Sequence, residues 1–158
     1  MAGILIYFCA ESLRFLGFSL PIISPLTKAV IRRKEQDRLV LGPVTLGLGA
    51  LLVLLIFPPQ PAAAAIYALA FGDSAASLAG KFLGKWRPAF LFGKSIEGSV
   101  ACFAVVLFSA YAVCGNVNIA LAAAFTAMII EAMPLEDYDN LAIPVVVGLV
   151  VKILMVLS

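Results

Sequence analysis

Histidine is absent from this chain of 158 residues, and charged residues are scarce, at 13 % of the sequence. Without histidine there is no imidazole for acid–base chemistry at neutral pH, for haem ligation or for a mixed Cys/His zinc site. A soluble domain is usually about a quarter charged, so this chain has too few polar residues to cover a water-exposed surface. The composition therefore excludes an ordinary soluble enzyme, a nucleic-acid-binding module and a disordered chain.

Apolar residues dominate instead, at 63 % of the chain, and the mean hydropathy is +1.10. A helix that spans a bilayer needs about 20 apolar residues. The sequence contains apolar runs close to that length, at 3–23, 39–57, 62–80, 98–114, 119–133 and 141–157. We therefore expect an all-α integral membrane protein, a polytopic bundle of about six transmembrane helices that forms a single domain over residues 1–158.

The basic residues are distributed unevenly among the connections between these runs. The first, third and fifth connections hold nine of the eleven Lys and Arg residues, and the second and fourth hold none. Those nine are Lys28, Arg32, Arg33, Lys34, Arg38, Lys81, Lys85, Arg87 and Lys94. Short basic connections remain in the cytoplasm, which predicts that both termini lie outside. The other two connections, Pro58–Pro61 and 115–118, are short turns, so any site in a loop faces the cytoplasm.

The third run carries two stripes of residues at four-residue spacing, which lie side by side on a helix. One stripe is small (Gly72, Ala76, Gly80 and Gly84) and the other is polar (Asp73, Ser77, Lys81 and Lys85). Asp73 lies about 16 Å into this helix, near the bilayer centre, where an aspartate costs about 2.5–3.5 kcal/mol. We expect its carboxylate to hold a metal ion for phosphate chemistry, and the alternative is an interhelical hydrogen bond or ion pair. Gly72, Gly80 and Gly84 either pack against another helix or, for the latter two, let phosphates approach the backbone.

The connection that follows combines cations with a helix N-terminus, where free amides favour anions. Its cations Lys81, Lys85 and Lys94 precede Ser95 and Glu97 at the start of the fourth run. With Asp73 and Glu97 as metal-binding carboxylates, this set fits a Mg²⁺-bound polyphosphate. Taken separately, Ser95 is an ordinary N-cap and the lysines anchor the loop in the cytoplasm.

Further charged residues are expected on the same side of the membrane. Glu11 and Arg14, three residues apart, can pair within the first run. Glu131 lies where the fifth run returns to the cytoplasm, and Asp139 or Asn140 is placed to cap the sixth helix. These five residues are additional candidates for the site. Lys152, near the outer end of the last run, is expected to extend to the interface.

Together these motifs resemble one family of membrane enzymes. The matching residues are Gly72-Asp73-Ser74-Ala75-Ala76, Gly80, Gly84-Lys85 and Lys94-Ser95-Ile96-Glu97-Gly98, with weaker matches at Glu11-Ser12-Leu13-Arg14 and Asp139-Asn140-Leu141-Ala142-Ile143-Pro144. The chain is similar here to the dolichol kinases, phytol kinases and CTP-dependent diacylglycerol kinases, which are related to the phosphatidate cytidylyltransferases. Kinases of this group usually carry a basic, histidine-containing N-terminal motif. Either Arg32, Arg33 or Lys34 supplies those charges here, or that part is absent from this chain.

The resemblance implies an enzyme that uses CTP and a divalent cation such as Mg²⁺ to phosphorylate a lipid alcohol. It implies that Asp73 is the main catalytic or metal-binding carboxylate, that Lys94 and Glu97 serve the nucleotide site, and that Gly80 keeps this site open. Two alternatives stay open. A cytidylyltransferase would make a CDP-lipid with the same Mg–triphosphate cradle, and a small transporter would use Asp73 and Glu11 to carry protons or cations. The lipid and any pairing into a homodimer are left undetermined, and no nucleic-acid partner is expected.

Overall fold

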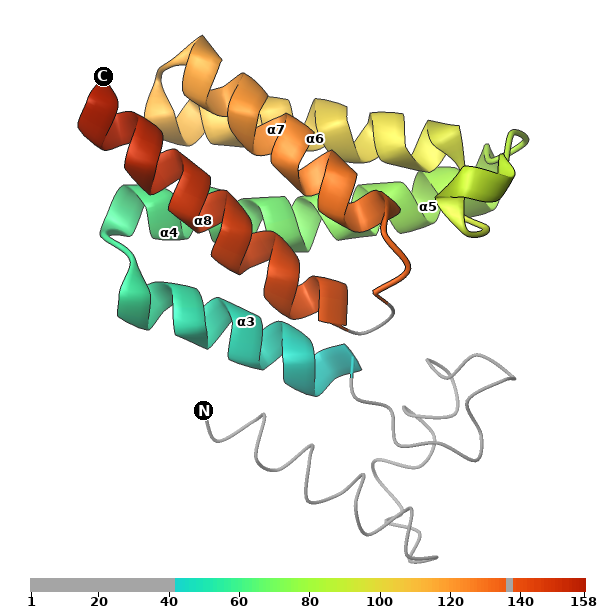
Figure 1. Cartoon of the computed structure of the whole chain (residues 1–158), viewed down its shortest axis with the longest axis horizontal. Helices are drawn as coiled ribbons and strands as arrows, with labels where there is room; N and C mark the ends of the chain where they lie inside the picture. Colours follow the sequence, from blue (N-terminus) through green and yellow to red (C-terminus); the bar gives the residue numbers. More distant parts are fainter. Residues whose placement is uncertain (1–41, 136–137) are drawn as a thin grey trace, which may run out of the picture. The chain divides into compact units, whose positions relative to one another are not determined.

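The computed structural model describes residues 42–135 and 138–158, and all regular structure within them is helical (Figure 1). The helices are α3 (Gly42–Ile56), α4 (Pro59–Tyr67), α5 (Ser74–Phe82), α6 (Ile96–Cys114), α7 (Val117–Ala132) and α8 (Asp139–Leu157). The chain divides into two compact units between Gly47 and Leu48. The helix contacts and the candidate site lie within the second unit. The expected run 3–23, the pair Glu11 and Arg14, and the basic connection from Lys28 to Arg38 lie outside the described residues.

Three of the described helices are long and apolar enough to cross a membrane. They are the continuous helix Pro59–Phe82, which joins α4 to α5, and helices α6 and α8. Helices α3 and α7 are apolar but have only 15 and 16 residues, which at about 1.5 Å per residue is less than the usual hydrocarbon thickness. The all-helical prediction is confirmed for the described part of the chain, and these apolar helices are consistent with a membrane protein.

Most helix ends follow from local residues. The Ser95 hydroxyl accepts the Gly98 N–H at 3.1 Å and caps α6. Gly115, with a φ of 66°, ends the same helix in the left-handed conformation that glycine tolerates. The Asn116 side chain then caps α7 by accepting the Asn118 N–H at 2.9 Å.

Two expected boundaries were wrong. The proline-rich stretch expected to be a turn contributes Pro59 and Pro61 to the first turn of α4, where a missing N–H is harmless and the fixed φ suits a helix. Asp139 and Asn140 lie inside α8, and neither is its N-cap; the N-cap is Tyr138, which makes no side-chain capping bond.

Small side chains allow the helices of the second unit to pack closely. Figure 1 shows α6 running back along α4 and α5, with α7 and α8 packed against them. The core consists largely of buried alanines and valines, including Ala68 and Val106. A Cβ on Gly98 would lie only 2.8 Å from the Ala76 carbonyl oxygen. The stripe of small residues on the third run is therefore the surface through which this helix contacts α6, as expected for a packing motif.

The helix Pro59–Phe82 is interrupted by the π-helical segment η2 (Ala68–Asp73). Single π turns are rare and occur frequently at functional sites. This one lies inside the second unit, where η2 contacts α6, α7 and α8, and it ends at Asp73. The sequence predicted a regular helix here, because no residue type marks a π turn.

Candidate functional site

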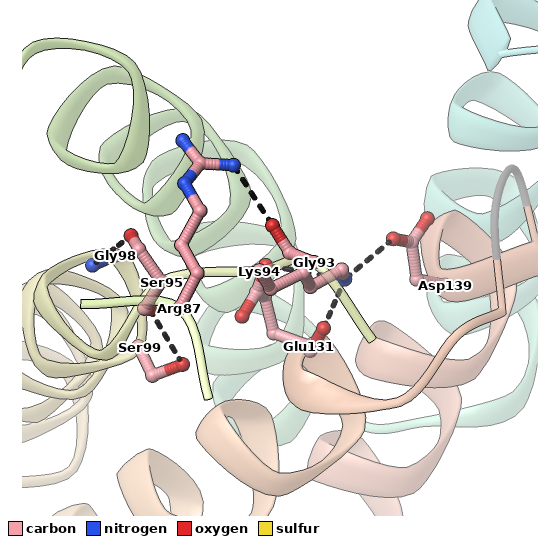
Figure 2. Close-up of polar contacts among 8 residues, drawn as sticks. All are labelled: Arg87, Gly93, Lys94, Ser95, Gly98, Ser99, Glu131 and Asp139. Atoms are coloured by element: carbon pink, nitrogen blue, oxygen red, sulfur yellow. Dashed lines mark hydrogen bonds and ion pairs between the residues drawn. The ribbon is translucent and has the colours of Figure 1, made fainter. Parts of the chain in front are cut away.

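Three charged residues from three separate elements meet at one end of the second unit (Figure 2). The Lys94 ammonium, just before α6, lies 3.2 Å from Glu131 Oε1 and 3.6 Å from Asp139 Oδ2. It also donates a hydrogen bond to the Glu131 backbone carbonyl. Glu131 comes from the end of α7 and Asp139 from the start of α8, so the α5–α6 and α7–α8 connections lie at the same end, as the sequence predicted for its third and fifth connections.

The three side chains differ in exposure. The Lys94 side chain is 28 % exposed, whereas those of Glu131 and Asp139 are 9 % and 12 % exposed. Two carboxylates and one ammonium leave one negative charge without a salt-bridge partner among the described residues. A buried charge is tolerated when it is paired and hydrogen-bonded, so this excess is unusual.

The excess negative charge is less well stabilised at Glu131 than at Asp139. Asp139 occupies the first turn of α8, where the positive end of the helix dipole stabilises an anion. Glu131 occupies the last turn of α7, where the dipole disfavours one. Its second oxygen, Oε2, is buried and has no hydrogen-bond partner in the described part of the chain, although buried polar atoms rarely lack one.

Asp73 lies on the same helix as the small-residue stripe and is half-buried at the end of η2. The neighbouring Gly72 faces α6, where a Cβ would lie 3.2 Å from Cys102 Sγ. Asp73 therefore directly follows residues of η2 that contact α6.

Glu97, expected as a metal ligand, accepts backbone hydrogen bonds that hold the connection in shape. Its Oε1 accepts the backbone N–H groups of Lys85 at 3.1 Å and Trp86 at 3.2 Å, and its Oε2 lies 3.4 Å from the Trp86 nitrogen. Within the described ranges no group of three or more acidic or cysteine side chains is placed to hold a metal ion. A Mg²⁺ ion that keeps waters and phosphate oxygens needs only one or two carboxylates, and Asp73 fits that requirement better than Glu97.

Arg87 closes the same connection. Its guanidinium donates to the Gly80 and Gly93 carbonyls at 2.8 Å each (Figure 2 shows the bond to Gly93). Gly93 has a φ of 90° and the preceding Phe92 has a φ of 49°. A positive φ is uncommon for a residue other than glycine, so Phe92 marks a sharp turn of the backbone. The connection thus has a defined shape fixed by Arg87 and Glu97.

Ser95 occupies the space beside the two glycines that were expected to admit phosphates. Its hydroxyl lies 3.1 Å from where a Cβ on Gly80 would be and 2.8 Å from one on Gly84. Ser95 is 3 % exposed and caps α6. This arrangement favours the packing alternative for both glycines and the capping alternative for Ser95.

The remaining candidates lie along the polar stripe of α5 and just beyond it. Ser77, Lys81 and Lys85 are exposed, and neither lysine forms a salt bridge within the part of the chain that the structure describes. The Lys81 ammonium lies 5.8 Å from the centre of the Phe82 ring. Asn140 is buried next to Asp139. Among the described residues, Lys81 and Lys85 are therefore exposed cations without a salt-bridge partner, whereas Lys94 already has partners.

The sequence indicated Lys94, Glu131 and Asp139 separately and missed their association. Lys94 and Glu131 are 37 positions apart, and only the antiparallel order of α6, α7 and α8 brings them together. The available signal was that all three residues lie where apolar runs meet connections on one side of the membrane.

Comparisons with known proteins add no neighbour to this description. A scan against protein-family models finds no match, and searches among curated proteins and among solved structures return none either.

Proposed function

We propose that this chain is an integral membrane, CTP-dependent lipid kinase that transfers the γ-phosphate of CTP to a lipid alcohol. In this proposal about six helices cross the membrane, both termini lie outside, and the connection between α5 and α6 faces the cytoplasm, where CTP is found. The observation that carries the proposal is Asp73: a carboxylate inside an apolar 24-residue helix, at a π turn, beside a connection that presents lysines. The resemblance of the motifs around Asp73 and Lys94 to lipid kinases supports the same reaction.

The exposed ammonium groups of Lys81 and Lys85 are suited to the triphosphate of CTP, because phosphoryl transfer depends mainly on positioning and charge neutralisation. Asp73 would hold the Mg²⁺ ion, which when bound neutralises charge on the β- and γ-phosphates. Glu97 and Arg87 keep the connection in the shape that presents these lysines. Lys94 completes the site from the opposite side, oriented by Glu131 and Asp139.

The test is a transfer assay with purified protein in nanodiscs. CTP labelled at either the α- or the γ-phosphate is supplied with Mg²⁺ and, in parallel, with a polyprenol, a diacylglycerol or phosphatidic acid. The proposal expects γ-label on one of the lipid alcohols. Transfer of α-label to phosphatidic acid would replace it with a cytidylyltransferase, and transfer of neither label, with no Mg²⁺-dependent binding of CTP, would favour a transporter.

The matched pair of variants is Asp73→Asn and Ser74→Ala. Asp73→Asn keeps the size of the side chain and removes its charge, so γ-transfer should fall by at least about 10²-fold. Ser74 is the exposed neighbour on the same helix, and Ser74→Ala should retain the wild-type rate. An active Asp73→Asn protein would contradict the proposal.

A further inference from the structure

We infer that Glu131 Oε2 is the acceptor for the hydroxyl of the lipid alcohol and takes its proton during transfer. This inference rests on the proposed function and assigns the place where the second substrate binds. It starts from a single unexplained atom, a carboxylate oxygen that is buried, has no hydrogen-bond partner among residues 42–135 and 138–158, and belongs to a side chain that is 9 % exposed.

The position of Glu131 is unfavourable for a purely structural ion pair. Lys94 supplies one positive charge to two carboxylates, and Asp139 already benefits from the N-terminus of α8. Glu131 lies at the wrong end of α7 for an anion. A glutamine there would accept the Lys94 hydrogen bond and remove the excess charge, whereas a carboxylate there gains from a ligand that donates a hydrogen bond to Oε2.

A hydroxyl suits Glu131 Oε2 better than a divalent cation does. Mg²⁺ loses its waters reluctantly and requires about six oxygen ligands, whereas Oε2 is buried and the other buried residues of α7 are all apolar. The hydroxyl of a lipid alcohol supplies one hydrogen-bond donor, and its hydrocarbon chain suits an apolar environment. The described residues also offer no third acidic or cysteine ligand that would complete a metal site here.

The proposed reaction balances with these residues alone and the two substrates. The hydroxyl proton passes to Glu131 as the alcohol oxygen forms a bond to the γ-phosphorus of CTP, and the bond from that phosphorus to the bridging oxygen breaks to release CDP. The proton then leaves to solvent. Lys94, whose ammonium contacts Oε1 of the same carboxylate, orients Glu131.

The first experiment measures binding without CTP or Mg²⁺. The probe is an isoprenoid alcohol of twenty carbons bearing a diazirine, in phosphatidylcholine nanodiscs, competed by the unlabelled alcohol or by its methyl ether, which cannot donate. Wild-type protein should prefer the alcohol by about tenfold, as expected for a hydrogen bond to a carboxylate. Glu131→Leu should remove this preference. Val100→Ala, at an exposed position on α6, should keep it.

A second variant of equal size tests whether the loss in Glu131→Leu comes from misfolding. Glu131→Gln still accepts a hydrogen bond but cannot take a proton at neutral pH, so it should keep part of the preference for the alcohol. In the transfer assay it should lower kcat by about 10²-fold or more, the usual contribution of a general base, with the KM for CTP unchanged. Glu131→Asp should restore part of kcat.

The two proposals fail in distinguishable ways. Preference for the alcohol that depends on Glu131, without transfer to any lipid alcohol, would retain the hydroxyl site and refute the kinase. Transfer by a protein that does not prefer the alcohol, or whose Glu131→Leu variant keeps the preference, would overturn the inference. Thermal stabilisation of wild-type protein by Mg²⁺ alone, lost in Glu131→Gln and without preference for the alcohol, would make Glu131 a cation ligand and would overturn it too.

Discussion

The two ends of the connection between α5 and α6 carry lysines in opposite environments. Lys81 and Lys85, at its start, are exposed, whereas Lys94, at its end, is held by Glu131 and Asp139. Exposed ammonium groups contribute little to stability, and a lysine between buried carboxylates contributes a great deal. Lysines of one motif therefore lie in different environments. Lys81 and Lys85 remain available for a ligand, and Lys94 joins three helices.

The largest expected effect is on stability at Lys94. Lys94→Met leaves Glu131 and Asp139 buried without their cation, which should lower the free energy of unfolding by about 3 kcal/mol. Lys85→Met should change it by no more than about 0.5 kcal/mol. Unfolding in mixed micelles with increasing SDS measures both. Equal losses in the two variants would remove the distinction between the ends of the connection.

The next effect concerns the packing that brings the two ends together. In Gly98→Ala the new Cβ would lie 2.8 Å from the Ala76 carbonyl oxygen and 3.1 Å from Ser95 Oγ. Separating α5 from α6 to relieve these contacts should cost about 2 kcal/mol, measured by the same titration. Val100→Ala, at a position that is 56 % exposed, is the control on α6. A Gly98→Ala protein as stable as the control would show that the helices separate without penalty.

A kinetic effect should appear at the exposed end. Under the proposed function, Lys85→Gln removes a charge from the triphosphate site and should raise the KM for CTP by about fivefold to tenfold, with stability unchanged. The same transfer assay at increasing salt should narrow the difference, because exposed charges are screened. Lys152→Gln on α8 is the matched loss of a lysine elsewhere and should leave KM unaltered; a rise there would indicate an effect of net charge alone.

The smallest effect is local and concerns Glu97. Glu97→Gln replaces the carboxylate that accepts the Lys85 and Trp86 amides, so these two amides should exchange with solvent about tenfold faster. The Leu83 amide, bonded to Ala79 O at 2.8 Å, is the internal reference. Hydrogen exchange followed by mass spectrometry reports all three, and unchanged protection at Lys85 and Trp86 would mean that the loop keeps its shape without this anion.

Much of the fold could be predicted from the sequence because its signals are local. The apolar runs, the Ser95 and Asn116 caps and the stripe that begins at Gly72 each depend on residues within a few turns of one another. The association of Lys94 with Glu131 depends on how α6, α7 and α8 pack, which one-dimensional spacing does not record. The sequence named Lys94, Glu131 and Asp139 as candidates one by one. Its expectation that Asp139 or Asn140 caps the last helix was wrong, because Tyr138 is the N-cap, and its expectation that Glu97 binds a metal stays a prediction.

The π turn at Ala68–Asp73 has a consequence for how this helix tolerates change in length. A π turn accommodates about one residue more than an α turn, so it is equivalent to a single insertion within a regular helix. Deleting one residue there, such as the exposed Ala70, would leave an unbroken α-helix. Asp73 and the glycine stripe would keep about their present direction relative to the α4 face that packs against α8, because the π turn takes up its extra residue over about the same rotation as an α turn. A single deletion within the π turn should therefore be tolerated better than one elsewhere in this helix, where it would rotate the following residues by about 100°.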